Sequence, residues 1–325
     1  MMKRTPTFHS SLAQAMTDFV TYKRIEGFDY TAQAVCLRYF DRFLSQQRHN
    51  QTTLNRQIVD AYVVDTAKQA PNTRYNRLSI IRVFSRYLHQ FAPGSYVLHE
   101  LNTKRPSLPR WYLYSSHDIA MLLRNAKTLR PTGSLRSHCF YMLIGLLYVT
   151  GLRIAEALAL DIKDIDTSCG SLFVHRGKFG KERYVVLAPS TLQAVEKYLR
   201  QRTAYEPSGV NTPFFLTTAT TTSGTRLKYS TAAQTFRQMV RQCGIDRDVQ
   251  QPPRLHDLRH TAACNCLLKW YDEGEDVNTK LPILATAMGH VNIECTQVYI
   301  HITSRLLEQA AQRFHVRFTD NSKGE

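Results

Sequence analysis

One segment of the sequence cannot form regular structure, and it divides the chain in two. Between residues 102 and 110, Pro106 and Pro109 interrupt any helix or strand, because proline lacks a backbone N–H and fixes φ. The segment is also basic, and its cations are Lys104, Arg105 and Arg110. We therefore predict two domains joined by a basic linker. The predicted ranges are 1–101 for the first domain, 102–113 for the linker and 114–325 for the second.

The first domain carries apolar side chains at the spacing of helices. One run comprises Leu12, Ala15, Met16, Phe19 and Val20, and a second extends from Val35 to Leu44. Residues three and four apart share one face of a helix, so an all-helical domain is predicted. Thr31 is a plausible N-cap of the second helix. A third helix is predicted over 60–68, and a fourth is predicted to start at Pro71 and end near Gln90.

The second domain is predicted to be mixed. Helices are expected over 118–126 (with Ser116 as a cap), 137–149, 191–203, 231–244, 256–271, 281–288, 293–300 and 303–314. A short helix is expected to carry Arg153 and Glu156. Two strand-like runs, 172–175 and 183–188, flank Gly177-Lys178-Phe179-Gly180-Lys181, which is typical of a hairpin turn. The predicted fold class is mainly α with a small β-sheet.

A cationic excess points to a polyanionic partner. The chain has 42 Lys and Arg against 26 Asp and Glu, a formal charge of +16. Such an excess favours nucleic acid as the partner. Four arginines of the fourth predicted helix are candidate phosphate contacts or simply its solvated face: Arg74, Arg77, Arg82 and Arg86.

Six residues from several motifs together have the chemistry needed to bind and cleave a phosphodiester. They are Arg153, Lys178, His256, Arg259, His290 and Tyr299, with Glu156 in a supporting position. Guanidinium groups grip phosphate oxygens bidentately and stay protonated. A tyrosine can attack phosphorus and form a covalent phosphotyrosine. One histidine can accept the phenol proton while the other holds an oxygen, and a lysine can protonate the leaving hydroxyl.

Plainer interpretations exist for each motif taken alone. Arg153 and Glu156 have the spacing of an ordinary helical ion pair, and Lys178 has the setting of any turn lysine. His256 and His260 have the i, i+4 spacing of a zinc helix, but Arg259 between them would repel a cation. We therefore predict no metal and no cofactor.

The motifs resemble the tyrosine recombinases, or phage-type integrases. The resemblance rests on Thr150-Gly-Leu-Arg153-Ile-Ala-Glu156, on the hairpin with Lys178, on His256-Asp-Leu-Arg259-His-Thr, and on Gly289-His290 nine residues before Tyr299. It covers 115–318, whereas the N-terminal part resembles the core-binding domain of that family only in pattern.

The resemblance implies a site-specific recombinase that needs neither metal nor ATP. It implies a homotetramer on double-stranded DNA with paired inverted-repeat sites, assembled with or without related recombinases or an accessory protein. Each Tyr299 would form a 3′-phosphotyrosine, and strands would exchange through a Holliday junction. A terminal helix over 303–314 would dock on its own domain or on a neighbour.

The segment between the two histidine boxes is longer than in many relatives. Its extra length, within 269–282, resembles a branch carried by transposons and other mobile elements, which implies integration, excision or cointegrate resolution. A type IB topoisomerase and a non-catalytic DNA-binding accessory protein are the alternative interpretations. Scattered cysteines and a start without an apolar run after Met1-Met2-Lys3-Arg4 predict a cytoplasmic protein at the nucleoid, without a membrane partner.

Overall fold

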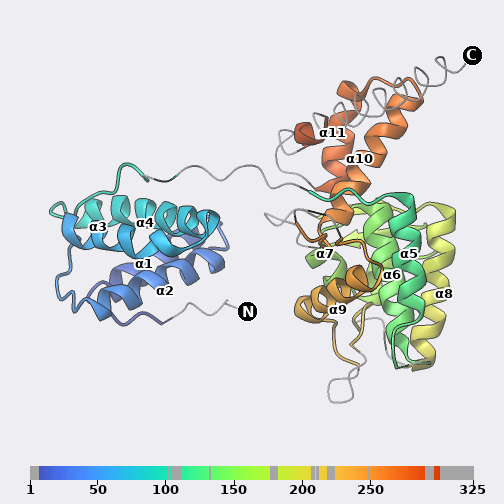
Figure 1. The fold of residues 1–325 in the computed structure, drawn as a ribbon, viewed down its shortest axis with the longest axis horizontal. Helices are drawn as coiled ribbons and strands as arrows, with labels where there is room; N and C mark the ends of the chain where they lie inside the picture. Colours follow the sequence, from blue (N-terminus) through green and yellow to red (C-terminus); the bar gives the residue numbers. More distant parts are fainter. Residues whose placement is uncertain are drawn as a thin grey trace, which may run out of the picture. The chain divides into compact units, whose positions relative to one another are not determined.

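The chain folds into two compact units, 1–109 and 110–325, and the division falls inside the predicted linker. The structure is a computed structural model, mainly helical with one small sheet (Figure 1). It describes residues 7–101, 103, 111–131, 133–175, 182–205, 209, 212–217, 224–247, 249, 251–289 and 296–300. The predicted fold class is confirmed.

The first unit consists of four α-helices and one 3-10 turn in its described part. The elements are α1 (Ala13–Ile25), α2 (Thr31–Gln46), α3 (Arg56–Asp65), η1 (Thr66–Lys68) and α4 (Pro71–Phe91). Aromatic rings fill the core, where Phe40 meets Tyr62 at 4.7 Å and Phe19 meets Phe84 at 5.5 Å between ring centroids.

Local signals set most of these helix ends. The Asn55 side chain accepts a hydrogen bond from Ile58 N and caps α3, and Pro71 occupies the first turn of α4. The predicted cap at Thr31 is wrong, because Tyr30 holds the N-cap position in the left-handed region. The Thr31 hydroxyl instead donates to the Asp29 carboxylate. The third helix starts four residues earlier than predicted, at Arg56.

The second unit is built around one buried helix. This is α6 (Leu135–Thr150), which packs against α5 (Ser116–Lys127), α8 (Pro189–Tyr205) and α10 (Asp257–Asp272) (Figure 1). A helix that packs on several sides needs apolar residues around its circumference, and the sequence from Cys139 to Leu147 supplies them. Ser115, rather than the predicted Ser116, caps α5 in a capping box with Asp118.

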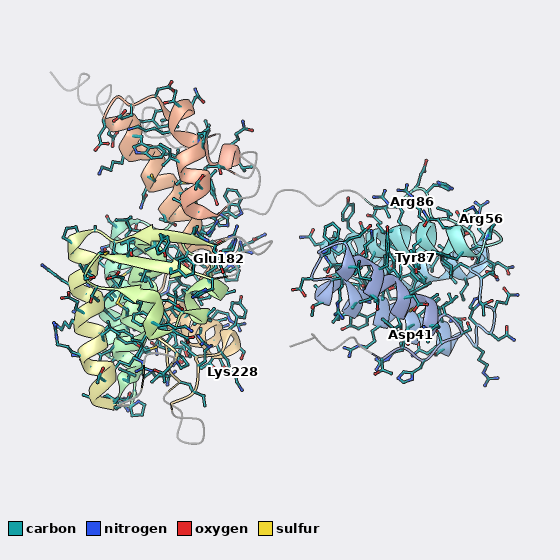
Figure 2. The ribbon with its side chains drawn as sticks, turned by 180° about the vertical axis from the view of Figure 1, so that it is seen from behind. Asp41, Arg56, Arg86, Tyr87, Glu182 and Lys228 are labelled. Carbon is teal, nitrogen blue, oxygen red and sulfur yellow. The ribbon has the colours of Figure 1, made fainter. Side chains whose placement is uncertain are left out.

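The remaining elements frame this core. They are α7 (Ile154–Ala159), η2 (Ile162–Asp164), β1 (Ile165–Asp166), β2 (Ser171–Val174), β3 (Arg183–Val186), α9 (Tyr229–Gln242) and α11 (Val277–Met288). The strands form an antiparallel sheet in the order β1-β2-β3, with Val174 opposite Arg183. The two predicted strands are therefore paired as a hairpin, and Glu182, just before β3, is labelled in Figure 2. Strand β1, only two residues long, was not predicted.

Helices α10 and α11 form a second small core at one end of this unit (Figure 1). The long segment between the histidine boxes is the end of α10, a turn at Gly274 with φ of +70°, and the start of α11. The Asp276 carboxylate caps α11 by accepting from Asn278 N. The helix therefore begins four residues before the predicted Leu281, and Pro282 lies inside it. None of the described helices is both long and apolar enough to cross a membrane.

Candidate active site

The C-terminal end of α11 gathers three arginines from distant parts of the chain. Its last carbonyls accept one hydrogen bond from each: Ala287 O from Arg183 Nε at 2.8 Å, Met288 O from Arg259 Nη2 at 2.7 Å, and Gly289 O from Arg153 Nη2 at 2.7 Å. Carbonyls at a helix C-terminus have no partner within the helix and carry partial negative charge. This end of α11 therefore attracts and orients cations.

Gly289 makes this convergence possible. Its φ of +66° lies in the left-handed region that glycine adopts freely, and it ends α11. A Cβ at this position would lie 2.7 Å from Arg183 Nη1 and 3.3 Å from Arg153 Nη1. Any side chain here would displace the two guanidinium groups.

Arg153 stands immediately before α7, where its backbone and side chain are both held by Glu156. The Arg153 N–H donates to Glu156 Oε2 at 3.0 Å, and Nη1 donates to Oε1 at 2.7 Å. The ion pair anticipated from the spacing is therefore present. Because a guanidinium has five N–H groups, Arg153 keeps donors beyond those that bind Glu156 and Gly289.

Arg259 is the deepest cation of the group, with only 2% of its surface exposed. It lies in the first turn of α10, and Nη1 donates to Gly151 O at 2.7 Å. Gly151 itself ends α6 in the left-handed conformation. Burial, and next the charge of Arg153, lower the pKa of Arg259 to about 10. Arg259 therefore remains protonated at neutral pH and lies within electrostatic range of Arg153.

The sequence motifs did not single out Arg183, the third arginine. It is the first residue of β3, and its Nη1 and Nη2 atoms donate to the two oxygens of Glu156 at 3.2 and 2.9 Å. The only available signal was its place at the end of the basic hairpin segment that contains Lys178.

Glu156 is the shared counter-ion of Arg153 and Arg183. Burial alone would raise the pKa of Glu156, but hydrogen bonds from Arg183 and Arg153 lower it to about 2. The carboxylate is thus buried and ionised, which a protein tolerates only when the charge is paired and hydrogen-bonded.

The Tyr299 hydroxyl is hydrogen-bonded to a histidine that the motif analysis considered only as a metal ligand. Tyr299 Oη lies 2.8 Å from His260 Nδ1, and Tyr299 is 2% exposed. The indole of Trp111 stacks on the His260 ring at 4.1 Å and an angle of 7°. His260 lies one residue after Arg259 and therefore next to the arginine cluster, and Tyr299 itself contributes to the electrostatic environment of Arg259.

His256 lies at the N-terminal end of α10. Its ring is perpendicular to that of His260, with 4.9 Å between centroids. Part of the residue meets solvent, yet desolvation by its neighbours, and next the charge of Arg259, lower the pKa of His256. At neutral pH this histidine is therefore biased towards its neutral form, which can accept a proton.

Several predicted site residues lie outside the described residues: Lys104, Arg105, Arg110, Lys178, His290 and the expected helix 303–314. Among the residues that the structure does describe, no group of three His, Cys, Asp or Glu side chains could hold a metal ion.

The four arginines of α4 have different settings in the first unit. The Arg77 guanidinium lies 3.8 Å from the centre of the Tyr39 ring, a cation–π contact. Arg74 and Arg82 are half-buried, while Arg86 is exposed and projects from α4 (Figure 2). Arg86 is therefore the most accessible of the four, and a role of any of them on DNA stays a prediction.

The fold thus gathers three arginines at the end of α11, with Tyr299 hydrogen-bonded to the residue that follows one of them. Residues 114–305 match the family model described as "Phage integrase family". A putative integrase/recombinase, y4rB, from Sinorhizobium fredii is 32% identical over 96% of this chain and 100% of its own length. The tyrosine recombinase XerD of Caulobacter vibrioides is 30% identical over 84% of this chain and 85% of its own.

A solved structure agrees with this assignment at the level of the fold. The Tn1549 transposon integrase, solved in complex with transposon right end DNA, covers 93% of this chain and 99% of its own, with a TM-score of 0.65 and 14% identity. The chain belongs to the phage integrase family, and it is a tyrosine-type site-specific recombinase.

Proposed function

We propose that this recombinase cuts and rejoins double-stranded DNA through a covalent bond to Tyr299. The observation that carries the proposal is that Arg153 and Arg259 donate hydrogen bonds to adjacent carbonyls at the end of α11. Two fixed guanidinium groups side by side match the two non-bridging oxygens of one phosphodiester. The phenol of Tyr299, hydrogen-bonded to His260 directly after Arg259 in α10, is the proposed nucleophile.

The chemistry can be written without a metal or a nucleotide. Tyr299 Oη forms a bond to phosphorus as the bond from phosphorus to the 5′ oxygen breaks. The phenol proton passes to a neighbouring histidine, and Lys178 gives a proton to the leaving 5′ oxygen. Arg153 and Arg259 neutralise the charge that builds on the non-bridging oxygens. The 3′-phosphotyrosine retains the energy of the phosphodiester, so a second 5′ hydroxyl can reverse the step.

The biological setting that we infer is recombination for a mobile element. The names of similar proteins support it: y4rB is called a putative integrase/recombinase, and the Tn1549 protein is a transposon integrase solved in complex with transposon right end DNA. In this proposal four protomers assemble on paired inverted repeats and exchange strands through a Holliday junction. His290, with the basic linker and the α4 arginines, would add further phosphate contacts.

The test is strand cleavage on the DNA that flanks the gene. Nicked duplexes from both flanks, incubated with the protein in EDTA, should yield a protein–DNA adduct that survives SDS. A supercoiled plasmid without these sequences serves as control, since a topoisomerase would relax it. Adduct formation that disappears in EDTA and returns with magnesium would contradict the proposed chemistry.

A further inference from the structure

A third arginine in the site has every side-chain nitrogen engaged by the protein itself. Arg183 is only 10% exposed in its side chain, and its Nε, Nη1 and Nη2 atoms donate to Ala287 O and to both oxygens of Glu156. Arg153 and Arg259, in contrast, donate through their two Nη atoms, and the Nε of each makes no hydrogen bond to the residues that the structure describes. Arg183 and Arg153 therefore share the Glu156 carboxylate but differ in how many of their side-chain nitrogens the protein engages.

We propose that Arg183 is a positioning residue that neutralises Glu156, so that the charge of Arg153 remains available to the DNA phosphate. This inference rests on the proposed function, because it concerns the same phosphate site. Arg183 does not touch the phosphate in this account. It acts through Glu156, which in turn holds the backbone and side chain of Arg153.

The argument starts from the charge of a buried carboxylate. Glu156 is 7% exposed and ionised, with a pKa of about 2. With Arg183 present, the group of Glu156, Arg153 and Arg183 has a net charge of +1. Without Arg183, Glu156 and Arg153 form a pair with no net charge. An arriving phosphate would then lie close to the Glu156 carboxylate, which contacts the Arg153 guanidinium that is meant to bind it. In a poorly solvated site such a like-charge contact is strongly unfavourable.

The position of Arg183 in the fold also joins three elements at this point. It begins β3, it contacts Glu156 of α7, and it donates to the end of α11. A purely mechanical role, in which Arg183 only ties β3 to α11, would use the same contacts. The charge of Glu156 distinguishes the two roles, since only the neutralising role depends on it.

The decisive comparison is therefore a double-mutant cycle between Arg183→Ala and Glu156→Gln. The first readout is the initial rate of adduct formation on a nicked duplex, divided by the folded fraction of each variant. Arg183→Ala should lower this rate roughly tenfold to a hundredfold, a loss comparable to that caused by removing a residue that supports a metal ligand. Adding Glu156→Gln should recover at least half of that loss on a logarithmic scale, because no charge then needs neutralising.

A second readout needs no catalysis. Inorganic phosphate, added to the protein at constant ionic strength, should raise the Tm of the wild type. The rise should be smaller for Arg183→Ala and should return in the double variant. Arg183→Gln, which removes the charge but keeps amide donors, replaces Arg183→Ala in both readouts if the alanine variant does not fold.

Arg226 and Asp161 provide a matched control. Arg226 pairs with Asp161 and donates to Leu158 O and Leu160 O, so it is a similar tie between segments of the same unit. Arg226→Ala should lower Tm but leave the phosphate-induced rise in Tm at the wild-type value. Adding Asp161→Asn should not change that phosphate-induced rise.

The two proposals fail in different ways. Suppose that the wild type forms no adduct on any DNA, but the phosphate-induced rise in Tm shrinks in Arg183→Ala and returns in the double variant. The proposed DNA cleavage is then wrong, while the neutralising role of Arg183 is supported. If adduct forms and Glu156→Gln leaves Arg183→Ala as slow as before, with no recovery in the phosphate readout, the neutralising role is overturned. Arg183 would then be only a mechanical tie.

Discussion

At the scale of single residues, the site depends on buried charges that are held in fixed partnerships. Glu156 carries a full negative charge inside the protein because two arginines bind it. Arg259 is 2% exposed and keeps its positive charge while two helix-end carbonyls accept hydrogen bonds from its guanidinium. In the proposed function, groups fixed in this way would need little reorganisation when a phosphate binds, which is how preorganised sites stabilise developing charge.

The pKa of Glu156 predicts a pH dependence of stability. Its folded-state pKa of about 2 lies below the ordinary value of 4.5, so the carboxylate favours the folded state above pH 4.5. This contribution is lost progressively as the pH falls from about 4.5 towards 2. Urea unfolding of the wild type and Glu156→Gln should therefore show a difference that shrinks across that range. A difference independent of pH between 6 and 3 would contradict the assigned ionisation.

The contact between His260 and Tyr299 predicts unequal effects of the two neighbouring histidines. His260→Ala removes the hydrogen bond to a buried phenol and the ring stacked on Trp111, which should lower the free energy of unfolding by roughly 1–3 kcal/mol. His256→Ala, at the partly exposed helix start, should lower it less. Chemical denaturation measures both, and equal losses would mean that the Tyr299 contact contributes little.

At the scale of elements, the end of α11 organises the site because its carbonyls face three arginines. Gly289→Ala should destabilise the protein and slow adduct formation, since a Cβ would lie 2.7 Å from Arg183 Nη1 at a φ of +66°. Gly145→Ala is the matched control. Gly145 lies inside α6 with nothing within 4 Å of an added Cβ, so alanine there should stabilise by about 0.5–1 kcal/mol. Calorimetry that gave the same sign for both substitutions would contradict this account.

Periodicity predicted the existence of nearly every described helix, because a buried stripe repeats visibly along the chain. It predicted less well whatever depends on contacts between distant segments. Strand β1 is too short to show alternation and exists through pairing with β2. The predicted start of α11 at Leu281 was four residues too late, because the helix is capped further upstream by Asp276.

In the candidate site, too, local motifs could be predicted from the sequence, whereas contacts between distant segments could not. The motif residues Arg153, Glu156, Arg259 and Tyr299 could be selected from local sequence, and the structure brings the two arginines and Glu156 together. Arg183 and His260 could not be assigned in this way. Their contacts depend on the approach of β3 and α10 to α11 and the Tyr299 segment, and they span 104 residues for Arg183 with Ala287 and 39 residues for His260 with Tyr299.

At the scale of the whole molecule, a charge of +16 favours binding to DNA. Arg86 on the first unit is exposed, and we expect it to contact a phosphate. Arg86→Ala should weaken binding to duplex DNA and reduce the slope of log K against log salt by about 1. Arg56, exposed and paired with Asp60, is the control, and both arginines are labelled in Figure 2. An unchanged slope for Arg86→Ala would remove it from the interface.

The central claim is that Tyr299 becomes covalently attached to DNA, and one measurement tests it directly. The wild type, Tyr299→Phe and Tyr271→Phe are incubated with the same nicked duplex, and SDS-resistant adducts are digested for mass spectrometry. Tyr271, partly exposed at the end of α10, controls for the loss of a tyrosine hydroxyl elsewhere in the second unit. The account predicts a nucleotide on the peptide that contains Tyr299 in the wild type and in Tyr271→Phe, and no adduct from Tyr299→Phe, which should still bind DNA. An adduct of equal yield from Tyr299→Phe, or a nucleotide on another residue, would contradict it.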